Sequence, residues 1–193
     1  MSLSWWEYLA VFSGSAVLCA FLTPIAMRIA FRSGALDPPG GHKSHGLPVP
    51  YLGGTAIVTA FAVAVAVAAL MSPPESGLDE LIVVLALAAV LALVGLFDDL
   101  RQLSPLWRLG VQITAAIVVW SIGSGVAMTT SNAPDLILTL LWVVGITNAF
   151  NLLDNMDGLA AGIAAITCLT FFTIAAMNGQ FLVAALSIGL AGC

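Results

Sequence analysis

The amino-acid sequence predicts an all-α, polytopic integral membrane protein, on three observations. Hydrophobic residues make up 61% of the 193 residues and charged residues 8%, whereas about 45 to 50% of a soluble domain is apolar. The apolar residues gather in runs close to the length of about 20 residues that a membrane-spanning helix needs. Short stretches rich in Pro, Gly and charge separate these runs. Helices are expected because backbone groups in lipid must be satisfied within their own segment.

The runs predict about six complete spans and the beginning of a seventh. The stretch that follows Phe181 is too short to cross a bilayer. We therefore expect residues 1–193 to form a single transmembrane domain that is the N-terminal portion of a longer protein. The predicted spans are residues 5–26, 53–71, 81–97, 109–127, 136–152 and 159–177, and a seventh from residue 181.

The basic residues predict the orientation. Because basic loops stay on the cytoplasmic side of a membrane, the N-terminus is expected outside and the ends of the third and fifth spans inside. The first span lacks a basic segment before it and a cleavage pattern after it, which favours a retained helix. The five basic residues all lie in or beside the first and third connections: Arg28, Arg32, Lys43, Arg101 and Arg108. With a net charge of −5 and no basic patch, no nucleic-acid partner is expected.

The third span ends in two adjacent carboxylates, Asp98 and Asp99. Ionisable residues at a membrane boundary are costly and indicate a functional site. Neighbouring side chains on a helix point about 100° apart, so a continuous helix would direct the two to different places. One would then contact a substrate while the other orients a base or a cation. The alternative is an acidic boundary balanced by Arg101.

The fifth span ends in four polar residues with a three-residue spacing: Asn148, Asn151, Asp154 and Asp157. Each such step turns about 300° in an α-helix, so the first and last would face opposite sides. For all four to serve one site, the helix must tighten or break between Asn155 and Gly158. Their oxygen atoms suit Mg²⁺, with Mn²⁺ as the alternative. Polar packing between helices is the other interpretation of the two asparagines.

The first connection, residues 37–54, contains several prolines and glycines. Proline fixes φ and glycine permits positive φ, so a shaped, non-helical loop is expected. Lys43 and His45 are suited to meet an anionic group. The alternative is an ordinary flanking loop in which Lys43 only sets the topology.

These three segments together resemble the polyprenyl-phosphate N-acetylhexosamine-1-phosphate transferase family. The segment from Pro48 to Gly54 looks more like the branch that uses UDP-N-acetylglucosamine or a related UDP-N-acetylhexosamine. Two positions depart from the family pattern: His42 stands where arginine is frequent, and Asn155 where glycine is frequent. The matching residues are Asp37-Pro38, Lys43, His45, Pro48, Pro50, Gly53-Gly54, Phe97-Asp98-Asp99, the run from Asn148 to Asp154, and Asp157-Gly158-Leu159.

The resemblance implies transfer of a sugar 1-phosphate from a UDP-N-acetylhexosamine to a polyprenyl phosphate, with Mg²⁺ required and UMP released at the cytoplasmic side of the bacterial inner membrane. It implies Asp98 as the possible base for the lipid phosphate, and Asp99 and Asp154 in the metal and diphosphate region. Asn151 would coordinate the metal, and Asp157 would orient the site. The implied substrate-contacting residues are Lys43, His45, Arg108 and Asn148, with Arg108 about where the family often has a lysine.

The resemblance also implies that a further metal-binding aspartate and a histidine-containing loop lie beyond Cys193, so this chain alone is expected to be inactive. A covalent phospho-enzyme remains an alternative to direct attack. The oligomeric state is open, a homodimer included. The rival class is a transporter or ion pathway, whose carboxylates more often lie near the bilayer midplane; a membrane scaffold without chemistry is a third hypothesis.

Overall fold

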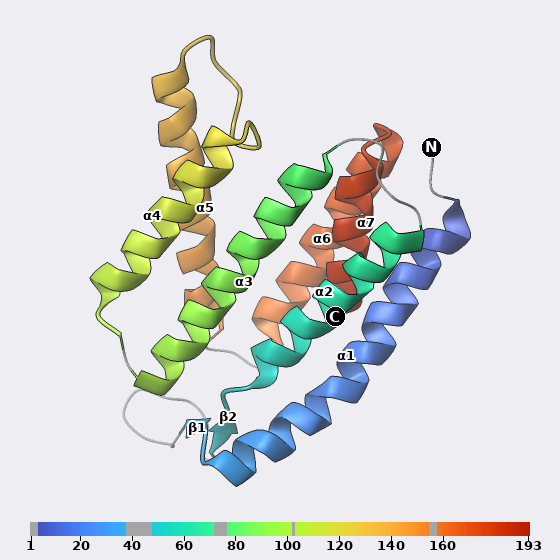
Figure 1. Ribbon diagram of the computed structural model, residues 1–193, viewed down its shortest axis with the longest axis vertical. Coiled ribbons are helices and arrows are strands. Elements are labelled where there is room, and N and C mark those ends of the chain that lie inside the picture. The colour runs from blue at the N-terminus through green and yellow to red at the C-terminus, as the bar shows by residue number, and fades with distance from the viewer. Residues whose placement is uncertain (1–3, 38–47, 72–76, 102, 155–157) are drawn as a thin grey trace. The chain divides into compact units, whose positions relative to one another are not determined.

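The computed structural model describes residues 4–37, 48–71, 77–101, 103–154 and 158–193, and helices dominate it (Figure 1). Two helices have the same bounds as predicted spans, residues 53–71 and 159–177. The helices are α1 Trp5–Ser33, α2 Gly53–Met71, α3 Leu78–Arg101, α4 Pro105–Ser121, α5 Asn132–Leu153, α6 Leu159–Met177 and α7 Phe181–Gly192.

Five of these helices are long and apolar enough to cross a membrane: α1, α2, α3, α5 and α6. This confirms the all-α polytopic class. Helix α4, with 17 residues, and α7, with 12, are shorter than the five.

Several predicted boundaries were wrong. Helix α1 continues past residue 26 to Ser33, because the charges of Arg28 and Arg32 do not interrupt a helix whose ends reach polar surroundings. Helix α3 similarly continues to Arg101. The predicted span 109–127 is shifted: Ser104 and Pro105 begin α4 as N-cap and first helical residue, and the helix ends at Ser121.

The all-α prediction also omitted a short strand pair. Strand β1, Leu36–Asp37, pairs antiparallel with β2, Val49–Pro50. The Tyr51 hydroxyl donates to Asp37 Oδ1 at 2.7 Å. The expected non-helical form of the first connection is confirmed for these ends, while residues 38–47 lie outside the described part.

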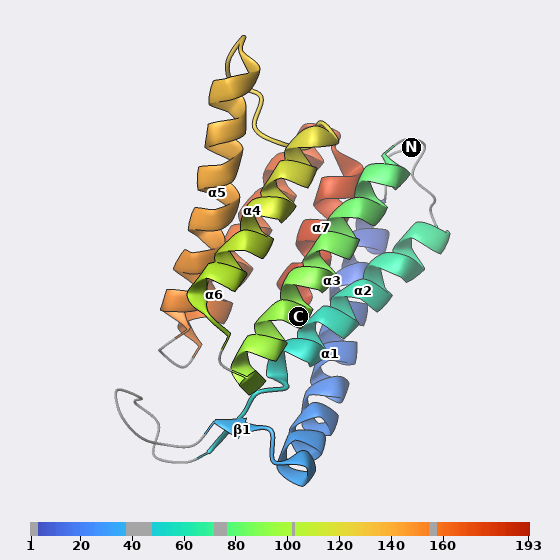
Figure 2. The same ribbon diagram turned by 60° about the vertical axis from the view of Figure 1, so that its left-hand side comes forward.

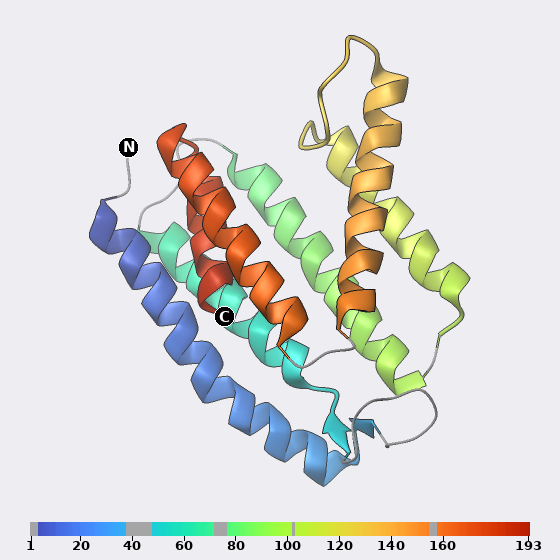
Figure 3. The ribbon, with the colours of Figure 1, turned by 180° about the vertical axis from the view of Figure 1, so that it is seen from behind.

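The chain divides into two compact units. Unit 1 comprises residues 1–76 and 158–193, and therefore α1, α2, α6 and α7. Helix α7 contacts all three other helices of this unit (Figure 3). The contacts rest on small residues, since Ser15 and Ala184 are fully buried. At Gly192 an added methyl group would meet the side chain of Ser15 and the carbonyl oxygen of Phe12. Small residues of this kind let helix backbones approach closely.

Unit 2 comprises residues 77–157, with α4 in contact with both α3 and α5 (Figure 2). Two side chains in the first turns of α5 accept hydrogen bonds from the backbone of the turn that joins α4 to α5. Asp135 Oδ1 accepts hydrogen bonds from the backbone N–H groups of Met128 and Thr129, at 3.2 and 2.9 Å. Thr139 Oγ1 accepts one from Val126 N at 2.9 Å. These bonds explain why the residues after Ser121 form a fixed turn and not a continuation of the helix.

The close approach of α7 to α1 gives a stability prediction. We expect Gly192→Ala to destabilise the protein by about 1 to 3 kcal/mol, the usual cost of overpacking a fitted contact, measured as thermal unfolding in detergent. The control is Gly14→Ala on α1, where an added methyl meets nothing within 4 Å and helix propensity improves by about 0.5 to 1 kcal/mol. Equal stability of the two variants would contradict the packing described.

Candidate functional site

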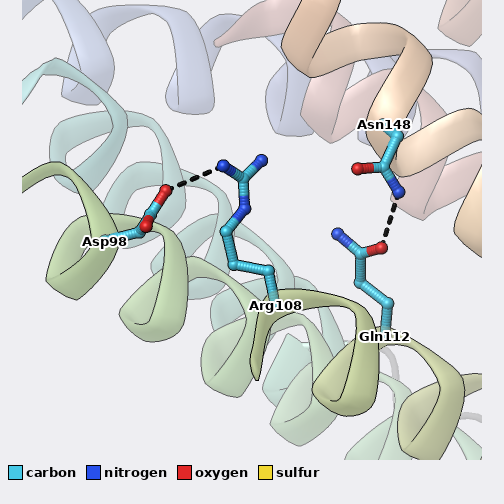
Figure 4. A network of polar contacts seen from close by, with 4 residues as sticks. All are labelled: Asp98, Arg108, Gln112 and Asn148. Atoms are coloured by element: carbon cyan, nitrogen blue, oxygen red, sulfur yellow. Dashed lines mark hydrogen bonds and ion pairs between the residues drawn. The ribbon is translucent and has the colours of Figure 1, made fainter. Parts of the chain in front are cut away.

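An ion pair joins the acidic end of α3 to the beginning of α4. Arg108 Nη1 lies 2.9 Å from Asp98 Oδ2, and the two side chains are 28% and 17% exposed (Figure 4). Asp98 lies in the last turn of α3, and Arg108 in the first turn of α4. Since both groups are largely withdrawn from solvent, the contact is stronger than a surface pair and holds the Asp98 carboxylate in one orientation.

The two adjacent aspartates have different surroundings, as the helix rotation predicts. Helix α3 runs through both, with Asp98 half-buried against α4 and Asp99 exposed. The alternative in which Arg101 balances the acidic pair does not hold for Asp98, whose partner is Arg108. The Arg101 guanidinium instead lies over the Phe97 ring, 5.9 Å from its centroid.

A second polar contact joins α4 to α5. Asn148 Nδ2 donates to Gln112 Oε1 at 2.6 Å and to its own helix at Val144 O, 2.8 Å away. Gln112 is only 6% exposed. The interhelical packing considered for Asn148 is thus confirmed, which leaves its predicted role as a substrate contact untested. Hydrogen bonds of this kind between apolar helices contribute about 0.6 kcal/mol on average, with larger values for some.

Helix α5 ends at Leu153, two residues before the predicted break at 155–158, of which residues 155–157 lie outside the described part. Asp154 N donates to Phe150 O at 3.2 Å, and Gly158 begins α6 with a φ of 75°. Asn151 and Asp154 are exposed. Asp157 lies outside the described residues, as do Lys43 and His45.

The metal prediction can be tested only against the donors that are described. Among the described residues, no three His, Cys, Asp or Glu side chains converge as a metal-binding group. Mg²⁺ typically uses one or two carboxylates and completes its shell with water and substrate phosphates. Asn151 and Asp154, two exposed oxygen donors at a helix end, fit such a partial site.

Sequence reasoning missed Gln112, which lies in an apolar run and has no motif around it. One signal was available: Arg108 and Gln112 are four residues apart and therefore share a helix face. Figure 4 shows this face, with Arg108 reaching Asp98 and Gln112 reaching Asn148. The candidate site is thus built from three helices of unit 2.

Comparison with known proteins defines the class of this chain. The sequence model of glycosyl transferase family 4 matches residues 81–193, which include most of α3 and all of α4 to α7. The chain therefore belongs to glycosyl transferase family 4. No solved structure matches it significantly.

Curated relatives in bacteria carry more specific names. The chain is 33% identical, over 90% of its length and 50% of the relative's, to the "Probable undecaprenyl-phosphate N-acetylglucosaminyl 1-phosphate transferase" of Bacillus subtilis. It is 33% identical, over 80% of its length and 42% of the relative's, to the decaprenyl-phosphate N-acetylglucosaminephosphotransferase of Mycobacterium tuberculosis. The phospho-N-acetylmuramoyl-pentapeptide-transferase of Heliobacterium modesticaldum is 28% identical, with 97% and 63% covered. The chain spans about half the length of the first two relatives.

The ion pair gives a prediction that needs no substrate. In a double-mutant cycle of Asp98→Asn and Arg108→Gln, we expect a coupling of about 1 kcal/mol in thermal unfolding, at the upper end for exposed pairs because this one is half-buried. The control cycle combines Arg108→Gln with Asp79→Asn, at the exposed start of α3, and should show no coupling. Strictly additive losses in the Asp98 cycle would contradict the contact.

Proposed function

We propose that the protein transfers N-acetylhexosamine 1-phosphate, with N-acetylglucosamine as the favoured sugar, from a UDP-sugar to a polyprenyl phosphate and releases UMP. The observation that carries this proposal is the half-buried Asp98 and Arg108 pair at the end of α3 in a family 4 chain. A carboxylate and a guanidinium side by side can hold an acidic phosphate acceptor and take its proton.

The relatives support the choice of substrates. The two compared at 33% identity are named as N-acetylglucosamine phosphate transferases acting with undecaprenyl and decaprenyl phosphate, whereas the muramoyl-pentapeptide enzyme is 28% identical. This agrees with the resemblance of the Pro48 to Gly54 segment to the N-acetylhexosamine branch.

In the proposed reaction, a phosphate oxygen of the lipid attacks the phosphorus that bears the sugar. The bond between the two phosphates of the UDP-sugar breaks, and UMP leaves with its electron pair. Asp98 orients the attacking phosphate and accepts its proton. Arg108 uses Nη1 for Asp98 and has further N–H donors for phosphate oxygens. Attack from an oxygen held in line gains most from this positioning.

The remaining roles concern the charge of the diphosphate. A bound Mg²⁺ would offset that charge and polarise the reacting phosphate, with Mn²⁺ as a substitute. Asn151 and Asp154 would hold the ion, Asp99 would lie in the same metal and diphosphate region, and Asp157 would orient the site. Lys43 and His45 would contact substrate phosphates.

An apolar hollow in unit 2 supports a lipid acceptor. It has a volume of about 370 Å³, and the residues that line it lie on both sides of Asp98 in the sequence. A hydrocarbon chain could therefore lie in it while the phosphate reaches the carboxylate. The side chains that line it are Leu93, Val94, Leu96, Phe97, Leu100 and Leu103.

The activity is tested by Mg²⁺-dependent UMP release from UDP-N-acetylglucosamine with undecaprenyl phosphate. The assay uses membranes that carry the complete polypeptide containing this sequence and, in parallel, the 193-residue chain. We expect release from the former and little from the latter. Asp98→Asn should lower it at least about 100-fold, the lower range for loss of a general base.

Asp79→Asn, at the other end of α3, is the control and should keep the activity. An Asp98→Asn variant as active as the unmodified protein would refute the role of Asp98. No UMP release with any UDP-sugar would refute the transferase, and a change in ion or solute flux would then favour the transporter hypothesis.

The site is proposed to face the cytoplasm from the inner membrane. In a background with alanine at Cys19, Cys168 and Cys193, we expect Met128→Cys to react with an impermeant maleimide added to intact cells. Ser104→Cys should react only after the membrane is opened. Met128 is 81% exposed, and the Ser104 side chain makes no capping hydrogen bond, so neither substitution should disturb the fold. The reverse labelling pattern would place the site outside.

A further inference from the structure

The orientation of the Asn148 side chain is determined by its partners. The carbonyl oxygen of Val144 can only accept a hydrogen bond, so the amide nitrogen of Asn148 must face it. The second hydrogen of the same nitrogen goes to Gln112, which must present its oxygen in return. Both N–H groups of Asn148 are therefore used, and its Oδ1 points elsewhere.

The same chain of bonds orients Gln112. With Oε1 committed to Asn148, its Nε2 points away from the contact. In Figure 4 this nitrogen and the Asn148 carbonyl oxygen both point to the side on which Arg108 lies. Among the described residues neither atom has a hydrogen-bond partner. The Gln112 nitrogen is not among the fully buried, unpartnered side-chain atoms of the described residues, so it is not completely enclosed.

We propose that Gln112 is a positioning residue of the transferase site, which fixes the Asn148 amide with its carbonyl oxygen toward the Arg108 side. This inference rests on the proposed function. Gln112 supplies the second of the two hydrogen bonds that hold this orientation. Without Gln112 only the Val144 carbonyl oxygen holds the amide, and N–H groups come more often to where the site now has an acceptor. A site that handles phosphates and a cation distinguishes sharply between those two groups. Gln112 thus acts through Asn148 and need not touch the substrate.

The test is a double-mutant cycle in the complete polypeptide, with UMP release and thermal unfolding measured on every variant. Gln112→Met keeps the side-chain length but removes the acceptor, and we expect kcat to fall about 10- to 100-fold, as for residues that orient a functional group. Once Asn148→Leu is present, Gln112→Met should lower kcat no further, because its effect passes through Asn148. Gln112→Glu keeps an acceptor for Asn148 and should stay closer to the unmodified activity than Gln112→Met.

The control variant is Thr114→Val on the same helix, since Thr114 is exposed and bonds only to Gly110 O of its own helix. It should keep full activity. Losses of kcat that multiply in the double variant, with the unmodified protein active, would overturn the inference and leave the proposed function standing. An inactive unmodified protein would contradict both the inference and the proposed function. Additive unfolding shifts for Gln112→Met and Asn148→Leu would by themselves contradict the hydrogen bond on which the inference rests.

Discussion

Two long polar side chains of α4, four residues apart, each have a partner on a neighbouring helix. Arg108 pairs with Asp98 of α3, and Gln112 with Asn148 of α5. A buried polar group without a partner costs about 1 to 3 kcal/mol. The two contacts therefore favour this arrangement of the three helices over others in which the Arg108 or Gln112 side chain lacks a hydrogen-bond partner. The candidate site is a consequence of that arrangement.

The helices of unit 1 are held by a different principle. Their contacts depend on small side chains and glycine, as at Ser15, Ala184 and Gly192, and so on shape complementarity. Such contacts tolerate little added volume. The pairs of unit 2 depend instead on charged and amide groups, and there the chemistry of this chain is expected.

The sequence predicted the helices well because their apolar runs are long and separated by Pro, Gly and charge. It predicted ends poorly wherever a charge was taken as a boundary, since Arg32 and Asp98 lie inside helices. The range predicted for α4 was shifted because the turn after Ser121 is fixed by Asp135 and Thr139, which are close in space only after folding. For the site, the sequence identified Asp98, Arg108 and Asn148 but not how they pair. Gln112 could not be predicted as a site residue, because a single amide in an apolar run gives no indication of which side chain it will contact after folding.

Arg108 can bind Asp98 and a phosphate at the same time, whereas a lysine would have one charged group for both. The guanidinium is planar and holds five N–H donors in fixed directions. One nitrogen, Nη1, is directed at Asp98, which leaves donors on the other nitrogens for a second anion. A lysine ammonium is a single compact charge, and a phosphate would compete with Asp98 for it. Under the proposed function, arginine lets the carboxylate keep its orientation while phosphate binds. The ion pair seen without substrate is then part of the working site and need not be broken for the reaction to begin.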